Sequence, residues 1–159
     1  MAKGFVTGLI VGALATAAVA QSNRIEGNMG LNHVGITVEN LPEAITTYNK
    51  MLGFGEAAVI RDDKGQPTLA FIQISRNTFI ELAPASATNR PGLSHFGLEV
   101  RDAKAAVVGL QQKGVKIDAP RAGRTVSLIT STTDPFGVRM ELSELGPESM
   151  LGKAIAGWR

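Results

Sequence analysis

The stretch LNHVGITV, at residues 31–38, is repeated as LSHFGLEV at residues 93–100. The two stretches share leucine, histidine, glycine and valine at the same offsets. A second repeated pair follows each of them, FIELA at residues 79–83 and RMELS at residues 139–143. Self-similarity at a fixed period indicates a duplicated structural unit. The chain is therefore expected to contain two copies of one module.

Each copy begins with a stretch that is typical of a half-buried strand. In the first copy, Val34 and Ile36 share one face and His33 and Gly35 share the other, which is the period-two alternation of a strand. Gly35 and its counterpart Gly97 each follow a histidine by two residues. We interpret both glycines as structural, at points of close backbone approach or of sheet curvature.

A helix should follow the first strand of each copy. Residues 41–52 have helical spacing of apolar side chains, with Asn40 as the N-cap and Gly53 at the end. In the second copy, Asp102 is the expected N-cap and Gly114 the expected stop.

Strand-forming runs separated by turn residues complete each copy. The Asp134-Pro135-Phe136-Gly137 turn precedes the last of them. The expected strands include residues 55–61, 67–75, 78–83 and 138–143. Each copy is thus a βαβββ unit, with modules at about residues 31–83 and 93–143 in one domain spanning 31–145. The fold class is α+β, and the tail at 146–159 has the apolar spacing of a terminal helix.

The first twenty residues differ from the rest of the chain. Lys3 is their only charge, residues 5–20 are apolar or small, and Ala18-Val19-Ala20 matches a signal-peptide cleavage site. The run is shorter than the ~20 strongly apolar residues of a membrane span. We expect residues 1–20 to be a Sec-type signal peptide and 21–30 a short linker, giving an exported, periplasmic or secreted protein. A buried helix and an uncleaved anchor are the alternatives.

Composition excludes several classes of function. The 159 residues carry 16 basic and 14 acidic side chains, and loss of Lys3 brings the chain closer to neutrality. No basic stripe with interleaved aromatic residues is present, so nucleic-acid binding is not expected, nor stable membrane association after cleavage. The absence of cysteine excludes disulfides and thiolate ligands, so any metal must be held by nitrogen and oxygen.

Four polar side chains lie at equivalent positions of the two copies, His33 with His95 and Glu81 with Glu141. Each lies on the strand face opposite its apolar neighbours, so all four should converge on the concave side of a curved sheet. Two imidazoles and two carboxylates suit one divalent ion, Zn, Ni, Co, Mn or Fe. A single histidine or glutamate in a strand usually packs or faces water, and a shared structural role for the four is the competing interpretation.

Paired βαβββ modules with a histidine in the first strand and a glutamate in the last resemble the vicinal oxygen chelate superfamily. The resemblance covers about residues 31–143 and is closest to bacterial glyoxalase I. It implies a curved mixed sheet around a metal site held by His33, Glu81, His95 and Glu141, and a homodimer. Members that only bind drugs, such as bleomycin resistance proteins, typically lack this ligand set, so its presence favours chemistry.

The resemblance also implies a reaction. A glyoxalase I-like lyase or isomerase acts on a small molecule with vicinal oxygens, such as a hemithioacetal, through an enediolate that the metal stabilises. Glu141 is the expected base, and Glu81 its partner across the metal. An exported location fits poorly with glutathione as the thiol, and equally poorly with an acyl-thioester epimerase.

Two other functions remain open from the sequence. An extradiol-type dioxygenase would use a similar site, but such enzymes generally carry a further active-site histidine, and this chain has only two. A non-catalytic small-molecule or metal-binding module of the same fold is the other alternative. Arg61, Gln73, Arg121 and Arg124 are candidates for contacting an anionic substrate, although solvated strand ends are the favoured interpretation.

Overall fold

The computed structural model describes residues 24–159. The expected signal peptide lies outside the described residues. Within the described part of the chain, no helix is long and apolar enough to cross a membrane. The first strand begins at Asn28, inside the segment that was expected to be a linker.

The first module follows the predicted βαβββ order. Asn40 caps its helix by accepting a hydrogen bond from the Glu43 backbone N–H at 3.2 Å, and Gly53 ends it with a φ of +73°. The last turn of this helix is a π-helix rather than the regular continuation that the spacing predicts. The elements are β1 (Asn28–Val38), α2 (Leu41–Thr46), η1 (Thr47–Met51), β2 (Gly55–Arg61), β3 (Pro67–Ser75) and β4 (Thr78–Pro84).

The second module repeats the order with a shorter first hairpin. Asp102 caps its helix by accepting a hydrogen bond from the Ala105 N–H at 2.9 Å, and Gly114 follows the helix with a φ of +82°. The elements are β5 (Gly92–Val100), α3 (Ala103–Gln112), β6 (Arg121–Ala122), β7 (Leu128–Thr133) and β8 (Arg139–Glu144). The tail forms a further helix, α4 (Met150–Gly157).

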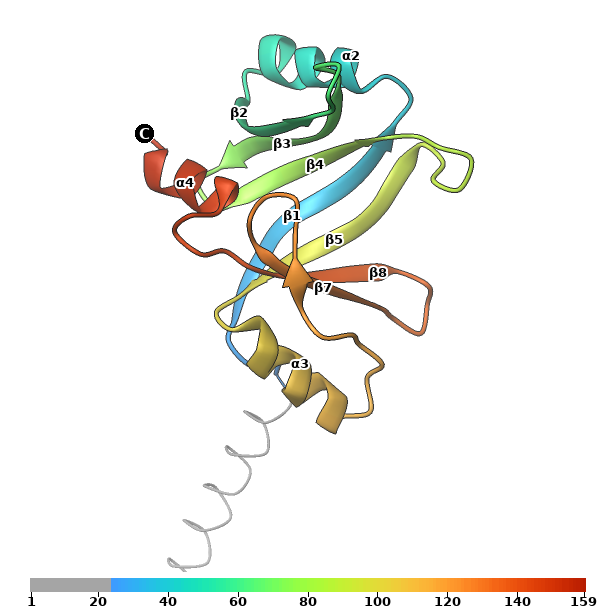
Figure 1. Cartoon of the computed structure of the whole chain (residues 1–159), viewed down its shortest axis with the longest axis vertical. Helices are drawn as coiled ribbons and strands as arrows, with labels where there is room; N and C mark the ends of the chain where they lie inside the picture. The colour runs from blue at the N-terminus through green and yellow to red at the C-terminus, as the bar shows by residue number, and fades with distance from the viewer. Residues whose placement is uncertain (1–23) are drawn as a thin grey trace, which may run out of the picture.

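The eight strands form one sheet in the order β2-β3-β4-β1-β5-β8-β7-β6. β1 and β5 pair antiparallel at its centre, and each pairs in parallel with the last strand of its own module. The two modules therefore join along their first strands, and the sheet curls between α2 at one end of the molecule and α3 at the other (Figure 1). The prediction of an α+β fold with two modules and a curved mixed sheet is confirmed.

Apolar packing fixes which face of the sheet is enclosed. α2 and α3 cover the outer face, where Leu82 and Leu142 are fully buried in two separate clusters. α4 instead packs on the inner face of the first module, where Leu151 contacts the cluster of Phe71 and Phe79. On β1, β4, β5 and β8, the residues that alternate with those of the outer face consequently point to the inner side of the sheet.

Candidate metal centre

Irregular pairing between β1 and β5 shapes the centre of the molecule. Asn32 is an extra residue in β1, because Leu31 and His33 face Leu98 and Gly97. Ser94 is the equivalent extra residue in β5, where Gly35 faces His95 and Ile36 faces Leu93. A β-bulge re-aims the side chains around it. The same bulge therefore precedes each of the two histidines.

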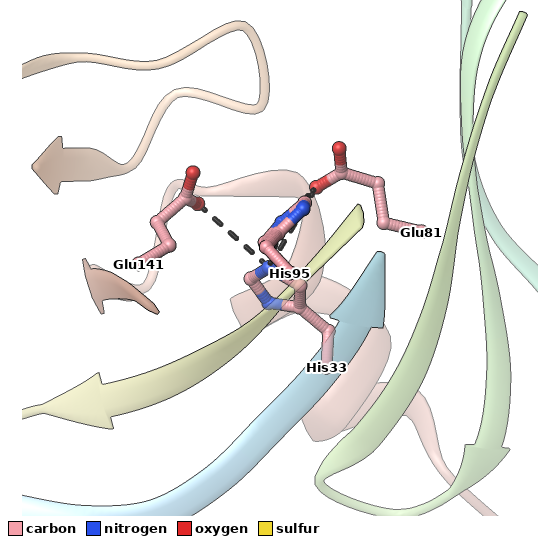
Figure 2. Close-up of side chains that lie close together, drawn as sticks. All are labelled: His33, Glu81, His95 and Glu141. Atoms are coloured by element: carbon pink, nitrogen blue, oxygen red, sulfur yellow. Dashed lines mark hydrogen bonds and ion pairs between the residues drawn. The ribbon is translucent and has the colours of Figure 1, made fainter. Parts of the chain in front are cut away.

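The four predicted ligands come together between the modules. Their donor atoms all lie within 4.8 Å of one another. Nε2 of His33 lies 3.1 Å from Nε2 of His95, and Oε2 of Glu81 lies 3.7 Å from each. Oε1 of Glu141 lies 3.8 Å from Nε2 of His33. Figure 2 shows the two carboxylates on opposite sides of the imidazole pair.

Each bulged residue contacts the histidine that follows it. Nδ1 of His33 lies 3.0 Å from Oδ1 of Asn32, whose amide nitrogen donates to the carbonyl of Asn77 at 3.5 Å. An amide oxygen only accepts, so Nδ1 of His33 carries the proton and Nε2 presents a lone pair. The Ser94 hydroxyl lies 2.9 Å from Nδ1 of His95 and can support the same tautomer. Such contacts orient metal-binding histidines.

Gly35 and Gly97 let the histidine rings cross the backbone. A Cβ atom on Gly35 would overlap the ring of His95, and one on Gly97 would overlap the ring of His33. Each glycine thus makes room for the histidine of the other module. The groups that approach the two glycines are side chains, whereas the sequence predicted close backbone approach or sheet curvature.

The environment of His33 keeps its ring neutral. Burial lowers its pKa from 6.5 to about 4, and the neighbouring His95 and Arg139 act in the same direction while Glu81 opposes them. His33 is 1% exposed. A neutral imidazole at neutral pH is the form that binds metals.

The two glutamates differ in their acidity. Burial alone would raise the pKa of Glu81, but the nearby imidazoles of His95 and His33 and the charge of Arg139 hold it below its ordinary value. The pKa of Glu141 is raised, because burial and the nearby Glu81 outweigh Arg139, whose guanidinium donates to Glu141 at 2.8 Å. The site therefore contains one carboxyl group with a lowered pKa and one with a raised pKa.

The donor set fits a divalent cation. Two lone pairs held 3.1 Å apart, on His33 and His95, repel each other unless a proton or a cation lies near both. Two adjacent ligands each ~2.1 Å from one ion are separated by roughly this distance. Two neutral imidazoles and two carboxylates also balance a charge of +2. The geometry and the chemistry are thus those of a site that could hold one metal ion.

A cavity of about 280 Å³ opens onto the cluster and is lined by residues of both modules and α4. Arg121 and Arg124 lie in its wall, where these exposed side chains could contact an anionic substrate. The other two candidates, Arg61 and Gln73, do not line the cavity. Arg61 donates to the carbonyl of Gly65 within its own hairpin, and the Gln73 amide donates to the carbonyl of Arg76.

Three residues of the site were not predicted from the sequence. Asn32 and Ser94 could have been predicted from the repeat, because each directly precedes the histidine of its own copy. Arg139 lies two residues before Glu141 on the same strand and hence on the same face. Its pairing with Glu141 could have been expected from that spacing alone.

Similar folds occur among solved structures. Methylmalonyl-CoA epimerase from Mycobacterium tuberculosis is 27% identical, with a TM-score of 0.66 over 80% of this chain and 97% of that one. The Streptomyces coelicolor methylmalonyl-CoA epimerase in complex with 2-nitronate-propionyl-CoA is 24% identical, with a TM-score of 0.63 over 74% and 97% of the two chains. A hypothetical protein from Bacillus halodurans is 20% identical, with a TM-score of 0.63 over 76% and 96%.

Comparison with curated proteins found no match. A family model described as Glyoxalase/Bleomycin resistance protein/Dioxygenase superfamily matches residues 32–129, which is more than half of the chain. The match includes His33, Glu81 and His95, while Glu141 lies beyond it. The chain belongs to the Glyoxalase/Bleomycin resistance protein/Dioxygenase superfamily.

Proposed function

We propose that the protein is a metal-dependent isomerase of the glyoxalase I type, which moves a proton on a carbon beside a carbonyl group. The observation that carries the proposal is the convergence of four donor atoms within 4.8 Å at the wall of a cavity. His33, Glu81, His95 and Glu141 would hold one divalent ion, Zn, Ni, Co, Mn or Fe. When bound, that ion supplies Lewis-acid stabilisation of charge on the substrate oxygens.

Glu141 is the proposed base. Its raised pKa makes the carboxylate a better proton acceptor than an ordinary glutamate. Arg139 donates to one carboxylate oxygen at 2.8 Å and the Ser143 hydroxyl to the other at 3.2 Å, which orients the group. Glu141 would take a proton from one substrate carbon and return it to the adjacent carbon. Glu81, with its lowered pKa, stays ionised and keeps its charge beside the histidines.

An epimerase is the second candidate, because the methylmalonyl-CoA epimerase from Mycobacterium tuberculosis is 27% identical over 80% of this chain. The first step is shared, since both reactions remove a proton beside a carbonyl group. They differ in where the proton returns: to the adjacent carbon in isomerisation, and to the opposite face of the same carbon in epimerisation.

The two candidates are separated by assays on the same preparation in deuterium oxide. Methylglyoxal with a panel of thiols tests isomerisation, and methylmalonyl-CoA tests epimerisation through deuterium uptake at the carbon between its carbonyl groups. Turnover of the methylglyoxal–thiol adduct that a chelator abolishes and added metal restores would support the isomerase, and such turnover of methylmalonyl-CoA would support the epimerase instead. Oxygen consumption with a catechol would instead indicate the dioxygenase, and ligand binding with no product would indicate a binding module.

Export and dimerisation are proposals that rest on the sequence and the resemblance. We propose that residues 1–20 are removed during export and that the mature chain forms a homodimer. N-terminal sequencing of protein from the periplasm or medium should begin at Gln21. Sedimentation equilibrium should give twice the mature chain mass, and an uncleaved N-terminus or a monomer would contradict the corresponding proposal.

A further inference from the structure

The cavity beside the cluster contains more positive charge than proton transfer requires. Arg121, Arg124 and Arg139 all line it. Arg139 pairs with Glu141, whereas neither Arg121 nor Arg124 has an ion pair among residues 24–159. Glu81 and Glu141 supply the acidic groups of the wall, and a divalent ion would offset their charge. Arg121 and Arg124 therefore have no acidic partner among the described residues of this cavity.

Arg124 is held in place across the boundary between the modules. It belongs to the loop between β6 and β7, and its guanidinium donates to the carbonyl of Thr68 at 3.3 Å and to the Thr68 hydroxyl. Thr68 lies near the start of β3 in the first module and also lines the cavity. A guanidinium has five N–H donors in a fixed plane, so this contact leaves donors free for a ligand.

The loop that carries Arg124 is strained. Val126 has a φ of +61°, a left-handed conformation that β-branched residues rarely adopt. Its side chain is 62% exposed, so packing of that side chain does not compensate for the strain. Backbone strain of this kind persists where the surrounding structure imposes it, and it concentrates at binding sites.

Hydrogen bonds at both ends impose the conformation of this loop. The Gly123 N–H donates to the carbonyl of Ser127 at 2.7 Å, which closes the loop. The Met150 N–H at the start of α4 donates to the carbonyl of Thr125 at 2.9 Å. Thr125 and Ser127 themselves line the cavity. The turn and these hydrogen bonds thus hold Arg124, an exposed residue, at the wall of the cavity.

We propose that Arg124, together with Arg121, binds an oxyanion of the substrate, so that the substrate is a carboxylate or a phosphate compound. As an account of substrate choice, this inference rests on the proposed function. Arg124 is then a specificity-determining residue, and proton transfer takes place in the same cavity. At about 280 Å³ the cavity is near the lower limit for ligand pockets, and it could enclose a small acid but not a large phosphate-bearing carrier.

The test is the affinity of two probes, malonate and inorganic phosphate, measured by calorimetry on metal-loaded protein. Arg124→Met should weaken binding of the preferred probe about tenfold or more, because charge-assisted hydrogen bonds are lost. Arg121→Met should act in the same direction, and Arg124→Lys should restore part of the affinity. Arg61→Met removes an exposed arginine outside the cavity and should change nothing.

Preference for malonate would identify a small acid, and preference for phosphate a phosphate-bearing substrate. Either preference supports the inference provided that it depends on Arg124. Binding that is unchanged in both Arg124→Met and Arg121→Met, or absent in the wild type, would overturn it.

Metal content measured on the same samples keeps the two proposals apart. Full metal loading with Arg-independent probe binding would overturn the oxyanion site alone. Arg124-dependent probe binding by protein that takes up no metal would overturn the proposed function and leave the oxyanion site standing.

Discussion

The last strands of the two modules carry the same glutamate in different surroundings. Glu81 lies between Phe79 and Ala83 on its face of β4, whereas Glu141 lies between Arg139 and Ser143 on its face of β8. The inner face of the first module is packed against α4, and Phe79 is fully buried there. Arg139 and Ser143 both line the cavity, whereas only Ala83 of the two residues that flank Glu81 does so. Duplication thus places equivalent ligands around the centre, and divergence of the flanking residues makes the two carboxylates unequal.

The largest expected effect on activity comes from replacing each of the two glutamates in turn. Glu141→Gln should lower kcat about a thousandfold even when excess metal is supplied, because the proton acceptor is removed. Glu81→Gln should act mainly through metal affinity, so excess metal should restore much of its activity. Kinetics at rising metal concentration compare the two, and equal losses that metal rescues equally would contradict the assignment of Glu141 as the base.

A steric prediction concerns the glycine that each module places against the histidine ring of the other. Gly97→Ala and Gly35→Ala should each weaken metal affinity about a hundredfold, because a Cβ atom would displace the histidine ring of the other module. Gly55→Ala is the matched control in a strand, since its Cβ atom would approach nothing closer than 4.0 Å. Competition with a chromophoric chelator measures all three. Unchanged affinity in the two ring-contacting variants would show that the rings are not held by these contacts.

Much of the fold could be predicted because it depends on local sequence signals. The repeat, the strand alternation, and the Asn40 and Asp102 caps all involve residues close together in the chain. The four-residue cluster could be predicted from the alternation of side chains along each strand, combined with the repeat. The alternation fixes which way His33 and Glu81 point without any knowledge of the contacts between strands.

The rest depends on contacts that sequence spacing does not encode. The bulges at Asn32 and Ser94 arise from the register between β1 and β5, which is set by pairing across the sheet. The position of Arg124 depends on the left-handed turn at Val126, a conformation that no propensity of valine would indicate. The split of one predicted helix into α2 and a π-helical turn likewise has no clear signal in residues 41–52.

A pH profile sharpens the comparison of the glutamates. Glu141 must be ionised to accept a proton, so kcat should fall as the pH drops through its raised pKa. Arg139 lowers the pKa of Glu141 by its charge, so Arg139→Met should move this acidic limb to higher pH by about one unit. An acidic limb that stays in place, or moves to lower pH, would mean that another group controls it.

The smallest expected effect is on stability. It concerns the loop that contains Val126, which belongs to the second module and has no counterpart from the first module in the cavity wall. Val126→Asn should raise the free energy of unfolding by about 1 kcal/mol, because asparagine tolerates the left-handed conformation better than valine. Val108→Asn, at another exposed valine within α3, should not stabilise the protein. Urea titration of both variants measures the difference. Equal changes would remove the argument for strain at this loop.

The metal content of the proposed mature chain, residues 21–159, shows whether the cluster is a metal site. Elemental analysis should find about one transition metal ion per chain, lost in His33→Ala and retained in Glu43→Ala, which changes an exposed helix residue outside the cluster. That result would establish that the four side chains act as ligands. A mature protein that contains no metal and cannot be loaded with any of the five ions would contradict the account.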